Sequence, residues 1–266
     1  MLSSITLGSY YLDIALVLRE AKFVNSIMVN SETWHNIQLK HIQSLEKCDT
    51  DLIRKIMNAN SKTAIEAFYL ELGIYQLRYT LAIRRFMYLW HILHRDTNEL
   101  IRKVYVAQSC KVNRGDWVKI VQEDIIKYGE FESDYQIASM SQEKFKILIT
   151  KKVKTHAIKY LHEMAQPHSK SENLINKDLA KQPYLSDRRF RKKDVQLLFT
   201  LRTKMFDCKS NFEHQHNMCC RVCNDANTIE DEDHILACKV LNTELHEVAF
   251  SDVYGNVNEQ YKAVQV

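Results

Sequence analysis

Glycine and proline are scarce in this chain, which has only 5 glycines and 2 prolines among 266 residues. Folds made of many short strands need both residues at their turns, so the scarcity argues against such folds and favours long helices. The chain also lacks a run of about 18 apolar residues, and we therefore expect no membrane-spanning helix. Hydrophobic residues nevertheless make up 45% of the sequence, which is enough for a sizeable core.

Several catalytic patterns are missing as well. The sequence contains no glycine-rich phosphate loop, no G-x-S-x-G motif and no adjacent Asp-Asp pair. A polymerase palm needs two carboxylates on a tight strand turn to hold its divalent ions. We therefore predict no catalytic residue and no independent enzyme activity. The acidic pair Glu123-Asp124 is interpreted as solvated surface, and the isolated thiols of Cys48, Cys110 and Cys208 are expected to be buried.

Cysteines are few and unevenly placed. Four of the seven lie between residues 219 and 238. An odd count with such crowding indicates a metal site in a reducing compartment rather than a disulfide framework. Residues 1–17 have no basic segment ahead of their apolar part, and Asp13 interrupts that part, so no secretory signal is expected. These features predict an intracellular protein, nuclear or cytoplasmic.

The crowded segment has the spacing of a zinc knuckle. Cys220 and Cys223 are separated by two residues, and His234 and Cys238 by three. Three thiolates and one imidazole suit tetrahedral zinc, and a filled four-ligand site leaves no water on the ion, so the site is predicted to be structural. Cys219 could compete with Cys220 as a ligand, and His214 and His216 are weaker candidates.

The second half of the knuckle is expected to lie on a helix. Thr228 is the predicted N-cap, and the acidic residues 230–233 would occupy the first turn, where the helix dipole favours negative charge. His234 and Cys238 would then share one helical face.

The net charge of +4 hides a strong asymmetry along the chain. Residues 1–140 carry a net charge of +1, residues 141–205 carry +10 and residues 206–266 carry −7. A basic segment beside a zinc module suggests polyanion binding, although a lysine-rich helix is often only a solvated surface. The predicted phosphate contacts are Lys151, Lys152, Lys154, Arg188, Arg189, Arg191, Lys192 and Lys193. Phe190 would either stack on an unpaired base or pack beneath its own loop.

Apolar periodicity predicts an all-α, multi-helix bundle followed by the Cys-Cys-His-Cys knuckle. The expected helices cover residues 10–27, 37–57, 61–72, 76–95, 97–108, 117–128, 141–164 and 192–206. Gly73 should end the third helix, while Asp96 and Ser141 should cap the fifth and seventh. Some cations of the 76–95 helix are candidates for phosphate contacts. Trp34, Trp90 and Trp117 are assigned to the core.

The predicted organisation has four parts. Residues 1–130 form a helical thumb-like domain, and residues 131–206 form basic connecting helices with a polar linker at 165–187. Residues 207–245 form the zinc-knuckle module, and residues 246–266 form a poorly ordered tail.

Several stretches resemble one known family. They are residues 61–73 (SKTAIEAFYLELG), 77–79 (LRY), 84–89 (RRFMYL), 98–100 (NEL), 115–117 (GDW) and 183–185 (PYL), followed by the knuckle. In this order they resemble LINE-type, non-LTR retrotransposon endonuclease–reverse transcriptases, over roughly residues 8–240. The resemblance covers the region after the polymerase palm, namely the thumb, the connecting helices and the knuckle, and its knuckle ligands correspond to Cys220, Cys223, His234 and Cys238.

The endonuclease domain and the palm aspartates of that family have no counterpart here. The resemblance therefore implies a C-terminal fragment or a degenerate copy, with RNA or DNA and the polymerase portion of the same element as partners. Two functions remain open on the sequence. One is a nucleic-acid-binding module that grips the RNA or DNA backbone. The other is a zinc-stabilised structural or protein-interaction module, or a remnant with no nucleic-acid role.

Overall fold

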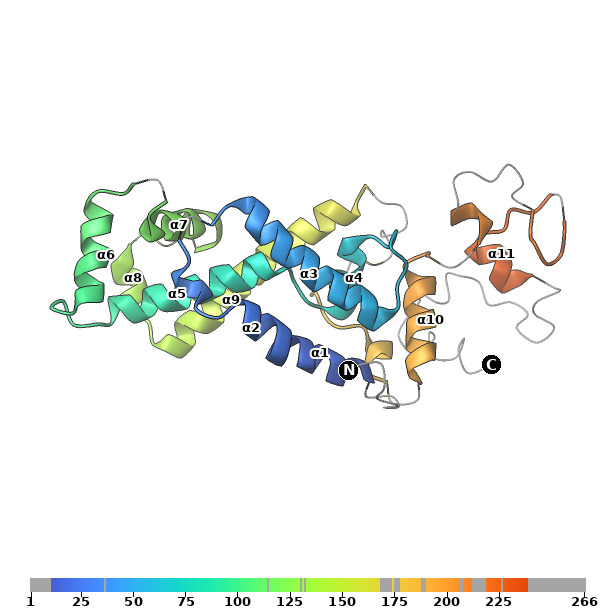
Figure 1. The fold of residues 1–266 in the computed structure, drawn as a ribbon, viewed down its shortest axis with the longest axis horizontal. Helices are drawn as coiled ribbons and strands as arrows, with labels where there is room; N and C mark the ends of the chain where they lie inside the picture. Colours follow the sequence, from blue (N-terminus) through green and yellow to red (C-terminus); the bar gives the residue numbers. More distant parts are fainter. Residues whose placement is uncertain are drawn as a thin grey trace.

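A computed structural model describes residues 11–35, 37–113, 115–129, 131, 133–167, 174, 178–187, 190–205, 208–211, 219–225 and 227–238. Helices dominate this part of the chain, and the described residues form no named strand. The predicted all-α bundle is therefore confirmed. The helices form an elongated body, with α6 at one end and α11 at the other (Figure 1).

The first helical run is continuous but changes its winding. It comprises α1 (Tyr11–Leu18), a π-helical segment (Arg19–Val24) and α2 (Asn25–Ile27). A short 3-10 turn follows at Ser31–Thr33. The run packs through Val24 and Met28 against Leu77 and Leu81 of the central helix α5 (Leu77–Leu93).

The next helices surround the tight turn at Gly73. Helix α3 spans Leu39–Met57, and α4 spans Ile65–Leu72. Gly73 ends α4 as predicted, with a φ of 65° in the left-handed region. A Cβ at this position would lie 2.2 Å from the backbone nitrogen of Lys181. Glycine is thus required here both for its conformation and for the close approach of a distant segment.

The end of the molecule beyond α5 consists of short helices. They are α6 (Leu100–Cys110), α7 (Trp117–Asp124), a π-helical turn (Ile125–Gly129) and α8 (Asp134–Ala138), which the sequence did not predict. The cap predicted at Asp96 is wrong, since Glu99 is the N-cap of α6. The Asp96 carboxylate instead accepts a hydrogen bond from the Asn98 backbone N–H at 2.7 Å, which makes a turn ahead of the helix.

Helix α9 (Gln142–Ala165) connects the two halves of the core. Its predicted N-cap is confirmed, because the Ser141 hydroxyl accepts a hydrogen bond from the Lys144 N–H at 3.4 Å. One half of α9 packs on α5 and on the π-helical turn after α7, through Phe145, Ile149, Val153 and Ala157. The other half, Leu161 and Ala165, packs with α1, α3, α4 and α10. The apolar cluster that contains Phe145, Ile149, Val153 and Ala157 includes residues on both sides of position 130, the boundary predicted between the thumb-like domain and the connecting helices.

The chain after α9 is more buried than a linker would be. Leu179, Tyr184 and Leu185 are 1%, 4% and 1% exposed, and all belong to the apolar cluster around α4. A 3-10 turn covers Pro183–Leu185, and α10 covers Lys192–Arg202. The described part of the predicted polar linker is therefore a packed loop. The predicted tail at 246–266 lies outside the described residues.

Buried ion pairs hold several of the arginines. The Arg19 Nε donates to the Asp49 carboxylate at 2.7 Å, and the Arg85 Nε donates to Asp124 at 2.6 Å. Asp124 is 8% exposed, so the prediction that it belongs to a solvated pair is wrong. Burial raises the pKa of its carboxyl even though the Arg85 guanidinium faces it.

Three arginines of α5 also form hydrogen bonds or ion pairs with other parts of the protein. Arg78 Nε donates to Glu46 at 2.8 Å, Arg84 Nη2 donates to Asn25 at 2.9 Å, and Arg85 pairs with Asp124. These three arginines, which were candidates for phosphate contacts, instead link α5 to its neighbouring helices.

The isolated cysteines and the tryptophans differ in how well they were predicted. Cys208 is buried as expected, but Cys48 and Cys110 are exposed. Trp34, Trp90 and Trp117 are half-buried members of the apolar clusters. Each of the last two also has its indole N–H satisfied by a backbone carbonyl, of Met140 at 2.9 Å and of Glu32 at 2.7 Å.

The pair between Glu71 and Arg202 gives a test of this packing. Both side chains are almost fully buried, and Arg202 Nη2 lies 3.0 Å from the Glu71 carboxylate. We predict that Arg202→Met lowers the free energy of unfolding by about 3–5 kcal/mol, because a buried carboxylate loses its counter-ion. Urea denaturation would measure the loss. The double variant Glu71→Leu/Arg202→Met should lose less than the single variant, and an equal or larger loss would contradict a charge-pair origin.

Candidate metal centre

The first two ligands come from a tight loop. The backbone N–H of Asn224 donates to the Cys220 carbonyl at 3.0 Å, and Asn224 has a φ of 53°, a left-handed conformation that asparagine tolerates. The Val222 N–H points at the Cys220 sulfur, with a separation of 3.4 Å. The loop thereby directs the Cys220 and Cys223 sulfurs toward one point and gives the first of them an N–H donor.

The other two ligands come from α11 (Glu232–Ala237) and the residue that follows it. The predicted N-cap at Thr228 is wrong. Asp231 is the N-cap, and its carboxylate accepts a hydrogen bond from the His234 N–H at 2.7 Å. Cys238 is the C-cap of this short helix, so His234 and Cys238 lie one turn apart.

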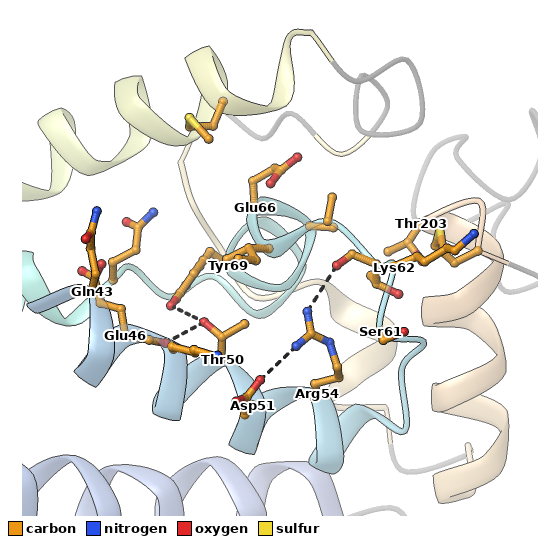
Figure 2. Close-up of a pocket in the computed structure, with 18 of the residues that line it drawn as sticks. Gln43, Glu46, Thr50, Asp51, Arg54, Ser61, Lys62, Glu66, Tyr69 and Thr203 are labelled. Atoms are coloured by element: carbon orange, nitrogen blue, oxygen red, sulfur yellow. Dashed lines mark hydrogen bonds and ion pairs between the residues drawn. The ribbon is translucent and has the colours of Figure 1, made fainter. Parts of the chain in front are cut away.

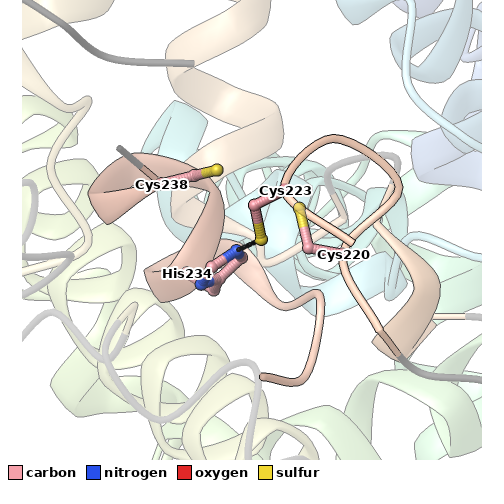
Figure 3. A group of neighbouring side chains, drawn as sticks. All are labelled: Cys220, Cys223, His234 and Cys238. Carbon is pink, nitrogen blue, oxygen red and sulfur yellow. Dashed lines mark hydrogen bonds between the residues drawn. The ribbon is translucent and has the colours of Figure 1, made fainter. Parts of the chain in front are cut away.

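The four predicted ligands meet in space (Figure 3). One ligand atom from each of Cys220, Cys223, His234 and Cys238 lies within 4.8 Å of the others. The Cys223 sulfur is 3.4 Å from His234 Nε2. A tetrahedron with metal–sulfur bonds of about 2.3 Å and a metal–nitrogen bond of about 2.0 Å has a sulfur–nitrogen edge of about 3.5 Å. The arrangement can hold a metal ion with only small movements.

The surroundings treat the two loop thiols differently. Burial raises the pKa of the Cys220 thiol, which is 1% exposed. The backbone N–H of Asp225 and neighbouring side-chain donors lower the pKa of Cys223 to about 7. Cys223 is therefore the more easily deprotonated of the two loop thiols, and the thiolate is the form of cysteine that binds a metal ion.

A buried carboxylate supports the loop from behind. Glu230 is 2% exposed and accepts hydrogen bonds from the Arg221 N–H at 2.6 Å, the Arg221 Nε at 2.7 Å and the Lys209 N–H at 3.2 Å. Burial favours its protonated form, but the donors and charge of Arg221 hold the pKa of Glu230 below its usual range. The interpretation of residues 230–233 as a helix-start charge effect is therefore wrong for Glu230, which braces the knuckle.

Cys219, the alternative to Cys220, lies outside the cluster. Cys219 pairs through its backbone with Ile229 in an isolated antiparallel bridge, and its sulfur is outside the ligand cluster. The backbone carbonyl of Cys219 also accepts a hydrogen bond from Lys209 Nζ at 2.6 Å. Cys220, and not Cys219, therefore belongs to the cluster that could hold a metal ion, as the two-residue spacing favours. His214 and His216 lie outside the described residues.

The predicted phosphate contacts do not form one surface. Lys151 is exposed and Lys154 is half-buried on α9, whereas Lys152 Nζ donates to the Gly129 carbonyl at 2.6 Å. This part of α9 packs on α5. Residues 191–193 lie at the start of α10, whose apolar side chains belong to the cluster around α4. Two separate groups of cations result.

The second group, near the start of α10, is described only in part. Phe190 is 8% exposed and lies in the apolar cluster around α4, so of its two alternatives the structure shows packing. Arg191 is 85% exposed but faces Asp194 at 3.1 Å. Lys193 is exposed and Lys192 half-buried. Arg188 and Arg189 lie outside the described residues.

The sequence did not identify two residues that support the knuckle, or one exposed lysine of α9. Lys209 and Glu230 brace the knuckle through contacts that no spacing rule encodes. Lys144 is exposed on α9, seven residues before Lys151. Seven residues are about two helical turns, so this spacing could have shown that the two lysines share one face of the helix.

Among helices in the described part of the chain, none combines the length and apolar character that a membrane crossing requires. Comparison of the chain with protein-family models, curated proteins and solved structures finds no match.

Substitution of one ligand tests the site. We predict that Cys223→Ser lowers bound metal well below one ion per chain and increases amide hydrogen exchange across residues 208–238, because the metal supplies much of the folding energy of such small modules. Elemental analysis and hydrogen-exchange mass spectrometry would measure both effects. Cys219→Ser is the matched control and should keep full occupancy. Full occupancy in Cys223→Ser would show that the ligand set is wrong.

The brace behind the loop gives a second test. We predict that Glu230→Gln lowers metal affinity by about 10–100-fold, the usual effect of losing a group that orients metal ligands. Competition with a chromophoric chelator would measure the affinity. Asp233→Asn removes the same charge from an exposed side chain beside His234 and should have little effect. Equal losses in both variants would indicate a general charge effect instead.

Proposed function

We propose that the protein is a nucleic-acid-binding helical module that grips the backbone of RNA or DNA, and that its knuckle holds zinc. A row of cations along the solvent side of α9 carries this proposal. Lys144, Lys151 and Lys154 lie on the side opposite Phe145, Ile149 and Val153, and none of the three has an ion pair with a described residue. The row belongs to the segment with a net charge of +10.

The dimensions of the row suit a phosphate backbone. Residues 144 and 154 are ten positions apart, which is about 15 Å along an α-helix. Successive phosphates of one duplex strand advance about 3.4 Å along the axis, so the row spans about four of them. Ile147 is 64% exposed within the row and offers an apolar contact for sugars or bases.

Zinc is the metal that the donor set favours. Soft thiolates and an imidazole in a four-ligand tetrahedral set select zinc over the hard cations magnesium and calcium, which prefer oxygen. Three thiolates on a divalent ion leave a local charge of about −1. The ion therefore stabilises the C-terminal module and does not itself attract phosphate.

The sequence resemblance to the C-terminal region of non-LTR retrotransposon reverse transcriptases supports the same function. In that setting the module would hold element RNA or target DNA while the polymerase portion of the same element copies it. We propose no polymerase activity for this chain, because no motif in its sequence matches the palm aspartates.

The salt dependence of binding tests the proposal. Fluorescence anisotropy would be measured with labelled single-stranded RNA and duplex DNA across a salt series. We predict that replacing Lys144, Lys151 and Lys154 with Gln reduces the slope of log K against log salt by about 2.7 for duplex DNA, and by about 2.1 for a single strand.

Three exposed lysines on other helices provide the matched control. Replacing Lys40, Lys55 and Lys103 with Gln removes the same charge and should leave the slope nearly unchanged. Equal effects of the two triple variants would show attraction by net charge alone. If the wild-type protein binds neither nucleic acid at low salt, the proposal fails and the alternative of a zinc-stabilised interaction scaffold gains support.

A further inference from the structure

Helix α6 and the residues just after it carry the densest group of exposed apolar side chains in the described part of the chain. Fifteen large apolar side chains are exposed there, and four of them lie within residues 100–112. They are Leu100, Val104, Val106 and Val112, with exposed fractions of 77%, 46%, 47% and 37%. A surface helix normally turns charged and polar side chains toward solvent. The outer face of α6 departs from that pattern and offers an apolar contact surface.

The apolar face runs along the whole helix. Leu100, Val104 and Ala107 follow one another at spacings of four and three residues, which places them in one row. This spacing, with leucine and a β-branched residue in turn, is that of helices that pair in coiled coils. The buried Tyr105 belongs to the core, on the other side of the helix. Among the seven exposed residues of α6, only Lys103 is charged.

The position of α6 leaves this face accessible to another molecule. The helix lies at one end of the elongated body, and the knuckle helix α11 lies at the other end (Figure 1). Its contacts with the body are to α5 and α7. Two molecules can therefore meet through their α6 ends while their C-terminal modules stay far apart.

The charges at the two ends of α6 indicate a second copy of this chain as the partner. Asp96 and Glu99 lie just before the helix and Lys111 just after it, and all three are exposed. In an antiparallel pair the acidic start of one α6 lies beside the basic end of the other, and the two-fold symmetry repeats this contact. A parallel pair would bring like charges together. Complementary surface charges of this kind set orientation more than affinity.

Two features keep such a pair weak. The two-fold axis brings the Lys103 side chains of both copies to the same side of the interface, where they repel each other. Glu99 lies one helical turn before Lys103, the spacing at which opposite charges interact along a helix, and offsets part of this repulsion. The 11 residues of α6 are about 16 Å long, so the paired faces bury less than the roughly 1,200 Å² of a stable interface.

We propose that α6 pairs antiparallel with the α6 of a second copy and makes the protein a weak, symmetric dimer. The row of Leu100, Val104 and Ala107 forms the centre of the interface, and Glu99 of each copy faces Lys111 of the other. The dimer does not depend on nucleic-acid binding. In combination with the proposed function, it presents two α9 lysine rows to one nucleic acid and raises the avidity of binding.

Sedimentation velocity of the whole chain over a wide concentration range tests the dimer, in reducing buffer so that the exposed Cys110 forms no disulfide. Wild type should change from monomer to dimer as its concentration rises. Leu100→Glu should weaken the dimer by about tenfold or more, because it places a charge in the apolar row. Leu39→Glu is the matched control, since Leu39 is also the first residue of its helix and is 61% exposed. It should leave the dimer unchanged, and both variants should keep the wild-type melting temperature.

Exchange of the end charges tests the orientation. Glu99→Lys and Lys111→Glu should each weaken an antiparallel dimer by about fivefold, because each creates two like-charge contacts. The double variant Glu99→Lys/Lys111→Glu should regain wild-type association, since the charges are again complementary.

A monomer at every concentration, or equal effects of Leu100→Glu and Leu39→Glu, would overturn the proposal. Losses that the double variant does not rescue would overturn the antiparallel arrangement. These variants leave the α9 lysines in place, so their failure says nothing against nucleic-acid binding. Failure of the α9 triple variant would count against the proposed function and not against the dimer.

Discussion

One buried carboxylate, that of Glu71 on α4, joins the 182–184 loop and α10 to the helical body. It accepts hydrogen bonds from Tyr184 Oη at 2.6 Å and from Arg202 Nε at 3.0 Å. The backbone carbonyl of the same residue accepts a bond from the Gln182 N–H at 3.0 Å. Two segments more than 100 positions away, separated by 113 and 131 residues, thus meet at a single side chain that is fully buried. The neighbouring Gly73 lets the 180–181 backbone come close enough for this meeting.

This buried network favours one arrangement of the three segments and adds comparatively little to the free energy of unfolding. A buried ion pair repays its desolvation only when its lone pairs are satisfied, and here Tyr184 and Arg202 supply the donors to the carboxylate. The same logic applies to Arg19 with Asp49 and to Arg85 with Asp124. It also explains why counting charges overstates the surface available to a polyanion. Several arginines serve as internal connectors, and the exposed cations of the described residues are mainly lysines spread over several helices, α9 among them.

Local patterns predicted what depends on local physics. The apolar periodicity located α3, α5 and α9, and the Ser141 cap and the Gly73 stop follow from backbone groups within one turn. The cluster of four knuckle residues was also predictable, because the short Cys220–Cys223 and His234–Cys238 spacings encode it. The caps at Asp96 and Thr228 failed in the same way, since the true helix start lies three residues later in each case. At Asp96 the side chain forms a turn ahead of the helix, a use that competes with capping.

The sequence could not predict long-range partners. Nothing near Asp124 indicates that Arg85 will neutralise it, and nothing near Glu230 indicates that Arg221 and Lys209 will surround it. A cavity beside α4 is a similar case (Figure 2), because its lining residues come from α3, α4 and α9 and become neighbours only after folding.

The knuckle and that cavity are physically connected through a short segment. Lys209 and Ser210 donate their backbone N–H groups to Glu230, whose carboxylate fixes the Cys220–Cys223 loop. The next residue, Asn211, lines the cavity, as do Thr203 and Met205 just after α10. Because Glu230 is hydrogen-bonded both to the Cys220–Cys223 loop and to residues 209 and 210, the geometry of the loop is coupled to the segment that forms part of the cavity wall. A structural ion can therefore shape a distant polar cavity without contributing a ligand to it, because the coupling passes through two hydrogen-bonded turns of backbone.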